Sequence, residues 1–467
     1  MPFYQHPFFW TLVKILLLLA FLVNVAGLLT WVDRRLGGVI QDRIGPNRAY
    51  IPLLGKKLRV AGLLHTAADG LKFFFKEDFV PPRADKLLFA IAPIISMFPV
   101  LAIGAVIPMG DTICPGSIVG KSAAGNTVWP WVQRLGQCGI ETVGSGIDAY
   151  KLAPITLMVA PLSVGLLYVF AIAGQGIVGA AIAGTSSDNK FSLMGALRAA
   201  SQMVSYEVAM GLSLVGAMML YGTIRLDEMV RWQNENAWGV FVQPLACVLF
   251  FVAAVAEQKR IPFDLPEAES ELVSGYFTEY SGAKFMMFYF AEYAEVVTSS
   301  MLLVTIFFGG WSLPFFHRDG LTLAFGDNTI FQSHVPHIWM IIIGVLTFFG
   351  KTILLCWFQA VVRWSLPRFR YDQLMKLGWR VLLPASLANI LVTGVVWLAI
   401  SSSSASTQMI FKILGDCTQA VVALAATYGI IRFIIGFFTP SVHNPLRIMS
   451  AQKRTAPGGN ETLPIQT

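Results

Sequence analysis

Long apolar runs recur along this chain and are separated by shorter polar stretches. Nine of them reach or approach the ~20 residues that a helix needs to cross a hydrocarbon core. Their expected bounds are 9–31, 87–109, 154–183, 193–221, 239–257, 285–310, 338–362, 381–400 and 409–438. The pattern predicts an all-α integral membrane protein with about nine transmembrane helices.

A different pattern follows the first run, over residues 62–76. Apolar residues recur there every three or four positions, while His65, Asp69, Lys72 and Lys76 occupy other faces. This spacing predicts an amphipathic helix at the membrane interface on the cytoplasmic side. Two roles are open for it: simple anchoring, or covering a lateral opening through which a lipid-soluble substrate enters.

Composition excludes a soluble globule, because 55% of the residues are hydrophobic and 13% are charged, against roughly 25% charged in a soluble domain. The first run is too long for a signal-peptide core, so we expect it to stay in the mature protein. The net charge of +7 does not indicate nucleic-acid binding, because the basic residues lie in loops beside the spans.

Charge asymmetry between the loops predicts the orientation of the chain. The first connection is rich in Lys and Arg, whereas the second contains essentially Lys121 and Arg134. Basic loops stay in the cytoplasm. We therefore expect the amino terminus outside, the carboxyl terminus inside, and the insertion at 110–150 outside.

The five cysteines include no CxxC pair. This argues against a metal ion or an iron–sulfur cluster held by this chain, and any redox centre is expected on a partner. Cys114 and Cys138 both lie in the external insertion, where the compartment permits disulfides. We predict a disulfide between them, with two unrelated thiols as the alternative.

The connection after the fifth run is dense in carboxylates, with fewer basic residues. Exposed acidity is the simple explanation. Apolar residues such as Phe263 alternate with the acids, however, which indicates a segment folded against the bundle, where clustered carboxylates raise one another's pKa. The acids concerned are Glu257, Asp264, Glu267, Glu269, Glu271 and Glu279.

Charged residues also occur inside the expected spans, where each costs at least ~2.5–3.5 kcal/mol at the centre of the membrane. They are Glu207, Glu292, Glu295 and Lys351. Glu292 and Glu295 share one helical face, with Tyr289 and Tyr293 nearby to supply hydroxyls for a proton chain. The alternatives are a proton relay and paired charges that hold helices together.

Five long, irregular segments carry a resemblance to a known family. They are DRRLGGVIQDRIGPN, ADGLKFFFKED, GALRAASQMVSYEV, AEQKRIPFDLPEAESELVSGYFTEYSGAKF and LPRFRYDQLMKLGW. In this order they resemble the H-type membrane subunit of respiratory complex I, the proton-translocating NADH:quinone oxidoreductase, over residues 10–397. Motifs of this length are specific.

The resemblance implies a role for each matched residue, none of them catalytic in this chain alone. It implies a quinone chamber lined or supported by Arg34, Arg43, Asp69, Lys72, Phe263 and Asp264. It implies a proton path through Glu207, Glu257, Glu267, Glu269, Glu271, Glu279, Glu292 and Tyr293. Asp33, Arg368, Arg370 and Asp372 would brace the cytoplasmic face.

The resemblance also implies quinone as the substrate, with ubiquinone and menaquinone both open, and a place in the bacterial cell inner membrane. The implied partners are the peripheral-arm subunits that carry the terminal iron–sulfur cluster, the small membrane subunits and the antiporter-like subunits. The protein positions the quinone and supplies protons, while electrons arrive from NADH through partners.

Two features depart from the family pattern. Asp33 stands where the family usually has Glu, so the carboxylate is one methylene shorter. The chain also exceeds the usual length of the family, through an external insertion at 110–150 within the 1–400 membrane domain, an additional transmembrane helix at 401–438 and a basic cytoplasmic tail at 439–467.

Two other functions are compatible with such a sequence. The first is the homologous membrane subunit of a membrane-bound hydrogenase or ferredoxin-linked complex, although the match around 34–47 favours the quinone enzyme. The second is a freestanding proton-coupled transporter, against which the chain has no evident inverted repeat of broken helices.

Overall fold

The structure, a computed structural model, describes residues 7–46, 48–53, 56–58, 62–112, 156–317, 320–325, 328–333 and 337–401, with separate helical positions between 415 and 429. The chain forms two compact units, Met1–Gln419 and Ala420–Thr467. The described residues of the second unit are helical. All elements named below belong to the first unit.

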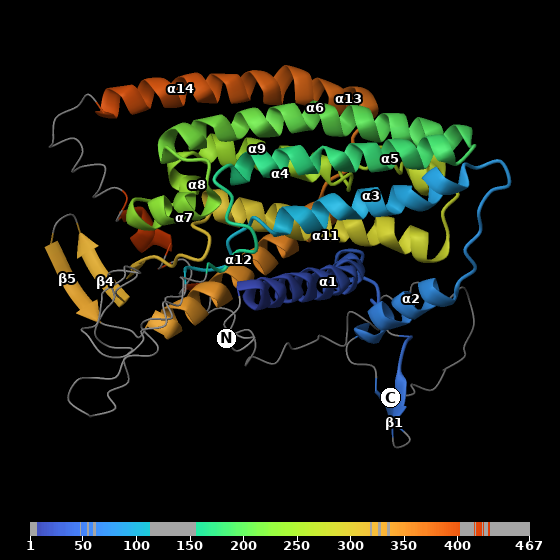
Figure 1. Ribbon diagram of the computed structural model, residues 1–467, viewed down its shortest axis with the longest axis horizontal. Coiled ribbons are helices and arrows are strands. Elements are labelled where there is room, and N and C mark those ends of the chain that lie inside the picture. The colour runs from blue at the N-terminus through green and yellow to red at the C-terminus, as the bar shows by residue number, and fades with distance from the viewer. Residues whose placement is uncertain are drawn as a thin grey trace, which may run out of the picture. The chain divides into compact units, whose positions relative to one another are not determined.

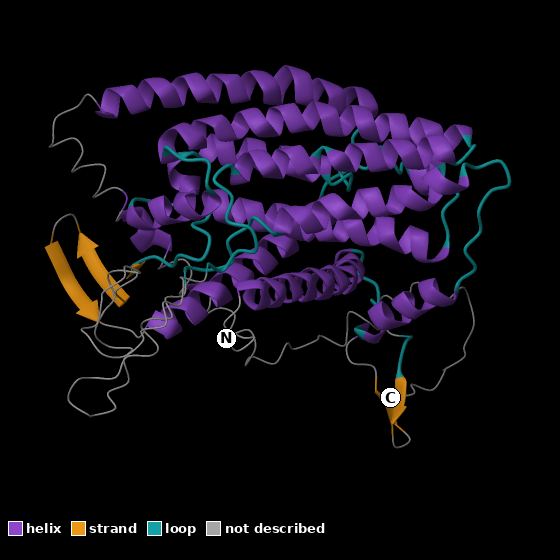
Figure 2. Cartoon of the chain, in the orientation of Figure 1, coloured by secondary structure: helices purple, strands orange, loops and turns teal. Residues whose placement is uncertain are grey.

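Seven described helical stretches are long and apolar enough to cross a membrane. They are α1 (Pro7–Ile40), α3 (Lys86–Gly104), α4 with α5 (Gly165–Ala173 and Gln175–Ser186), α6 (Lys190–Tyr221), α11 (Gly282–Phe307), α12 (His337–Ser365), and α13 (Tyr371–Lys376), which continues through a π-helical turn (Leu377–Leu382) into α14 (Leu383–Ser401). Figures 1 and 2 show these helices side by side. The chain is an all-α integral membrane protein, as predicted.

Three expected spans differ from the prediction or lie beyond the described residues. The third is divided at Gly174 into α4 and α5. The fifth is divided at Gln243 into α8 (Gly239–Val242) and α9 (Pro244–Glu257), and the 14 residues of α9 extend only about 21 Å. The ninth, at 409–438, lies almost entirely outside the described residues.

Local chemistry explains where several helices begin and end. The Asp85 side chain accepts hydrogen bonds from the backbone N–H groups of Leu87 and Leu88, which caps α3. Asn189 caps α6 in the same way, and Gly222 ends that helix with a φ of 65°, a conformation that favours glycine.

Helix α11 is at the centre of the described bundle. In its most apolar window 83% of the residues are buried, against 22–50% in the other six candidate spans. It packs against α1, α3, α9 and α12, while α6 packs against α5, α9 and α14 (Figure 1). Charged side chains on α11 are therefore held inside protein instead of facing lipid.

Shorter elements lie in the connections. The predicted amphipathic helix is confirmed as α2 (Leu64–Phe75), which packs beside α1 and α11 and exposes Leu71, Phe74 and Phe75. Two antiparallel sheets contain β1 (Ile51–Leu53) with β2 (Lys56–Leu58), and β3 (Phe316–His317), β4 (Gly320–Phe325) and β5 (Asn328–Ser333). Helix α7 spans Leu226–Glu235, and the acidic connection contains α10 (Glu269–Leu272) and a 3₁₀ turn (Gly275–Phe277).

Candidate functional site

A buried carboxylate in the last third of α1 joins four parts of the bundle. Asp33 is 5% exposed, and its Oδ2 accepts hydrogen bonds from the Tyr293 hydroxyl of α11 at 2.9 Å and from the Arg363 guanidinium of α12 at 2.5 Å. Arg260, in the connection after α9, lies 3.5 Å from the same oxygen and stacks 3.6 Å over the Tyr293 ring. The shorter Asp side chain thus reaches all three partners.

The tyrosine hydroxyls of α11 lead to this cluster. The Tyr289 and Tyr293 hydroxyls are 3.1 Å apart, and Tyr293 donates to Asp33. The sequence pattern suggests instead that these hydroxyls accompany Glu292 and Glu295. The difference arises because Tyr293 lies on the side of α11 that faces α1 and α12.

The acidic connection between α9 and α11 is folded against the bundle. Phe263 and Tyr276 are buried, and Phe263 stacks on Phe369 with 5.4 Å between ring centroids. Gln202 of α6 donates hydrogen bonds to the carbonyl oxygens of Ala256 at 2.7 Å and Phe263 at 2.8 Å. The connection therefore does not behave as a solvated loop.

One ion pair fixes the middle of this connection. Asp264 is 5% exposed, and its Oδ2 lies 2.7 Å from the guanidinium of Arg368, in the segment between α12 and α13. The other two residues expected to brace this face, Arg370 and Asp372, are exposed at the start of α13. Asp372 stands in the first turn of that helix, where a negative charge is favourable.

Glu267, Tyr276 and Glu292 form a second group of interacting residues, which joins the connection to α11. The Tyr276 hydroxyl donates to Glu292 Oε1 at 3.2 Å, and Glu292 is 4% exposed. Burial, the nearby Glu292 and Asp264 raise the pKa of Glu267 well above its usual range. Burial and nearby acids also raise the pKa of Tyr276. This shift favours the protonated form of Glu267.

The remaining acids of the connection divide into exposed and internal residues. Glu271 is 59% exposed and pairs with Arg198 of α6 at 2.7 Å. Glu279 accepts a hydrogen bond from the Asn189 side chain at 2.6 Å. Glu257, the last residue of α9, lines an internal cavity. The side chain of Glu269 lies outside the described part of the structure.

Glu207 occupies a half-buried position on α6. The carboxylate of Glu207 lies beside Gly174, between α4 and α5. If Gly174 were alanine, its Cβ would be 3.3 Å from Glu207 Oε1. Glu292 thus has a polar protein neighbour, Tyr276, while the Glu207 carboxylate lies beside Gly174.

The chamber residues expected on α1, just after it and on α2 lie at the surface of the bundle. Arg34 and Asp69 form a 2.5 Å ion pair that joins the two helices, with side chains 44% and 34% exposed. Arg43 and Lys72 are exposed. Phe73 of α2 stacks near Phe285 of α11 with 5.7 Å between centroids.

Lys351 of α12 has a different environment from the acids. Its ammonium donates to the carbonyl oxygens of Phe308 at 2.7 Å, Gly310 at 3.1 Å and Ser312 at 2.7 Å. It also lies 4.1 Å from the Trp238 ring centroid. The Lys351 ammonium thus provides hydrogen bonds to backbone carbonyl oxygens at the carboxyl end of α11, which indicates a structural role for Lys351.

Within the described ranges, no group of three or more His, Cys, Asp or Glu could hold a metal ion. Cys247, Cys356 and Cys417 are free thiols. Cys114 and Cys138 lie in 113–150, outside the described residues.

Sequence reasoning does not single out Gln202, Arg260, Tyr276 or Arg363, although all four organise the site. Basic residues are common at the cytoplasmic ends of membrane spans because they set the orientation of the chain. The sequence therefore gives no separate sign that Arg363 pairs with a buried acid. The alternation of acids with aromatic residues is the one available signal for Tyr276.

This combination defines a class: a polytopic α-helical membrane protein with buried acids and arginines joining its helices to a cytoplasmic-side acidic connection. The sequence matches the NADH dehydrogenase family over residues 13–394. The chain belongs to this family, which includes the H-type membrane subunits of complex I.

Curated relatives agree with this assignment. The first H-type NADH-quinone oxidoreductase subunit of Cytophaga hutchinsonii is 40% identical over 78% of this chain and 90% of its own length. The H-type subunit of Flavobacterium psychrophilum is 41% identical over 78% and 90%. The first such subunit of Geobacter sulfurreducens is 40% identical over 82% and 93%. With seven apolar helical stretches in the described ranges and bacterial relatives of this kind, the chain is a bacterial membrane protein.

Proposed function

We propose that this chain forms the quinone-binding chamber and the first part of the proton-coupling path of a respiratory complex I. As a family member, it is a subunit of the multi-subunit NADH-quinone oxidoreductase, whose relatives carry that name. The observation that supports the finer proposal is the buried charge cluster around Asp33, which connects α1, α11 and α12 to the acidic connection.

The chamber is proposed between the last third of α1, the interfacial helix α2 and the acidic connection. The exposed apolar face of α2 suits a helix that borders a lateral opening toward lipid. The Arg34–Asp69 pair ties that helix to α1. The proposed chamber residues are Arg34, Arg43, Asp69, Lys72, Phe263 and Asp264.

The proton path is proposed to begin at the acidic connection, because reduction of quinone to quinol takes up protons as well as electrons. The contact between Tyr276 and Glu292 and the raised pKa of Glu267 support this origin. The path residues proposed are Glu207, Glu257, Glu267, Glu269, Glu271, Glu279, Glu292 and Tyr293.

We propose that electrons arrive from a peripheral arm whose terminal iron–sulfur cluster faces the chamber, and that small membrane subunits and antiporter-like subunits continue the path. The basic first connection supports a chain in the inner membrane with its amino terminus outside and its carboxyl terminus in the cytoplasm. We also propose that the chain is divided into a membrane domain over 1–400, an additional transmembrane helix over 401–438 and a cytoplasmic tail over 439–467.

Neither rival function is favoured by a specific observation. The relatives are named for NADH and quinone, not for hydrogenase or ferredoxin chemistry. In a freestanding transporter, no peripheral arm would bind beside the acidic connection, and the connection would have no evident function.

The proposal is tested by replacing Glu267 and Glu269 together with Gln in the assembled complex. Proton transfer by a positioned group contributes typically ~10²–10⁴-fold to rate. We therefore expect quinone-dependent NADH oxidation and proton pumping to fall at least about tenfold. Both are measured in inverted membrane vesicles over a range of pH.

Glu235, exposed at the end of α7, provides the matched control as E235Q. NADH oxidation with a water-soluble acceptor reports whether the complex has assembled. Normal turnover and pumping by the double variant at every pH would contradict the proposed path.

A further inference from the structure

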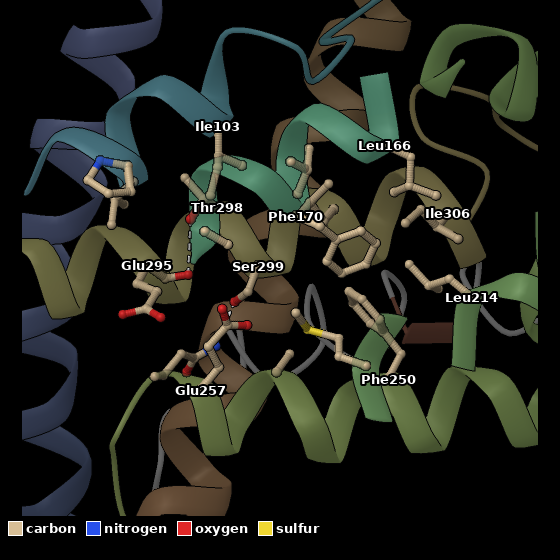
Figure 3. Close-up of a pocket in the computed structure, with 18 residues that line it drawn as sticks. Ile103, Leu166, Phe170, Leu214, Phe250, Glu257, Glu295, Thr298, Ser299 and Ile306 are labelled. Atoms are coloured by element: carbon tan, nitrogen blue, oxygen red, sulfur yellow. Dashed lines mark hydrogen bonds between the residues drawn. The ribbon is translucent and has the colours of Figure 1, made fainter. Parts of the chain in front are cut away.

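A small cavity lies inside the bundle between α3, α4, α6, α9 and α11, and its volume is about 50 Å³. In Figure 3 the carboxylates of Glu257 and Glu295 lie at one end of it, while Leu166 and Ile306 lie toward the other. The residues that make the first end polar are Glu257, Gln258, Glu295, Thr298 and Ser299.

Both carboxylates at this end lack a hydrogen-bond or ion-pair partner among the described residues. Their polar neighbours are already engaged: the Gln258 amide donates to Ser299 Oγ at 2.6 Å, and the Thr298 hydroxyl donates to the Glu295 backbone carbonyl at 3.2 Å. An ionisable group in a membrane span without any partner is costly. Because both carboxylates line the cavity, its interior can supply such a partner.

The size of the cavity limits what that partner is. A drug-sized organic ligand needs a pocket of roughly 300–1,000 Å³. A single water needs only about 10–15 Å³ of the same kind of volume, together with polar groups to bond. A cavity of about 50 Å³ therefore fits a few waters and excludes a quinone head group.

The charges that act on the two carboxylates belong to the connection, to α6 and to α11. They are Lys259 and Arg260 of the connection, Glu207 of α6 and Glu292 of α11. Lys259 is itself buried, with its ammonium 5.8 Å from the Tyr276 ring centroid. Both cations and other acids thus act on this pair.

We propose that this cavity holds water that links Glu257 to Glu295, and that Glu295 is a further proton-exchanging residue through which the path enters the membrane. In the step, the O–H bond of one protonated carboxyl breaks and its proton passes to water. The water transfers a proton to the other carboxylate, so atoms and charge balance without a co-reactant. This inference rests on the proposed function, since quinone turnover drives the transfer.

The test compares E295Q, E295D and E257Q in the assembled complex, with E235Q as the control. We expect E295Q to lower proton pumping and quinone-dependent NADH oxidation at least about tenfold. E295D keeps an ionisable group at the cavity and should restore most of both. E235Q should leave both unchanged, and NADH oxidation with a water-soluble acceptor should be normal throughout.

The outcomes separate this inference from the proposed function. Normal pumping by E295Q with a defective E257Q overturns the role of Glu295 and leaves the proposed path intact. Normal pumping by E257Q and by the Glu267/Glu269 double variant overturns the path itself.

Unaltered protein gives a second readout if E295Q fails to assemble. An apolar carbodiimide adds to a protonated carboxyl, and peptide mass spectrometry locates the adduct. We expect adducts on Glu295 and Glu257 that decrease as the pH rises. No adduct on Glu295 at any pH overturns the inference.

Discussion

The carboxylate of Asp33 offsets the positive charges of two guanidinium groups. These belong to Arg260 and Arg363, whose side chains are only 11% and 26% exposed. In D33N the size of the side chain is kept and the charge is lost. Removing one partner of a buried ion pair costs about 3–5 kcal/mol. We expect a clear fall in the thermal unfolding temperature of the purified complex, and D33E should lose less.

The matched control is D78N. Asp78 pairs with Lys284 at 2.9 Å, but its side chain is 45% exposed, and such surface pairs contribute only about 0–1 kcal/mol. If D33N and D78N unfold at the same temperature, Asp33 does not hold the cluster together.

Among the helices and connections, the segment from α9 to α11 should respond to pH through Glu267. Its pKa is raised in the folded chain above the ordinary 4.5 by burial, Glu292 and Asp264. The stability that such a group contributes is complete below the unfolded pKa and is lost as pH rises through the folded pKa. We expect the amide-exchange protection of residues 259–281 to fall with rising pH, and E267Q to weaken this dependence.

Protection is measured by hydrogen exchange with mass spectrometry and corrected for the intrinsic rate at each pH. The amides of α14 serve as the internal control. An identical pH dependence in E267Q and the unaltered chain would mean that another group controls the connection.

The sequence predicts most of these elements because a membrane span is defined by length and apolarity, which are local properties. Length and apolarity alone do not predict the division at Gly174 or Gln243; the local signals there are Gly174 and Pro244, residues that disfavour a continuous helix. At the site, the acids stand out by their cost in the membrane. Their partners do not, because Asp33 and Arg363 are 330 positions apart and meet only in the folded chain.

For the molecule as a whole, the site depends on residues from α1 to α13, all within the unit Met1–Gln419. A fragment of this unit that lacked residues 363–368 would lose the ion pairs of Asp33 with Arg363 and of Asp264 with Arg368. The disulfide between Cys114 and Cys138, which lies outside the described residues, stays a prediction. We propose that this unit presents a quinone chamber at α1, α2 and the acidic connection.

Photoaffinity labelling of the assembled complex with an azido-quinone, followed by peptide mapping, shows whether the chamber lies there. We predict labelled peptides from the last third of α1, from α2 and from residues 258–281, with labelling abolished by excess unlabelled quinone. If the labelling that excess quinone abolishes is confined to other subunits, or to segments of this chain remote from these three, the proposed position of the chamber is wrong.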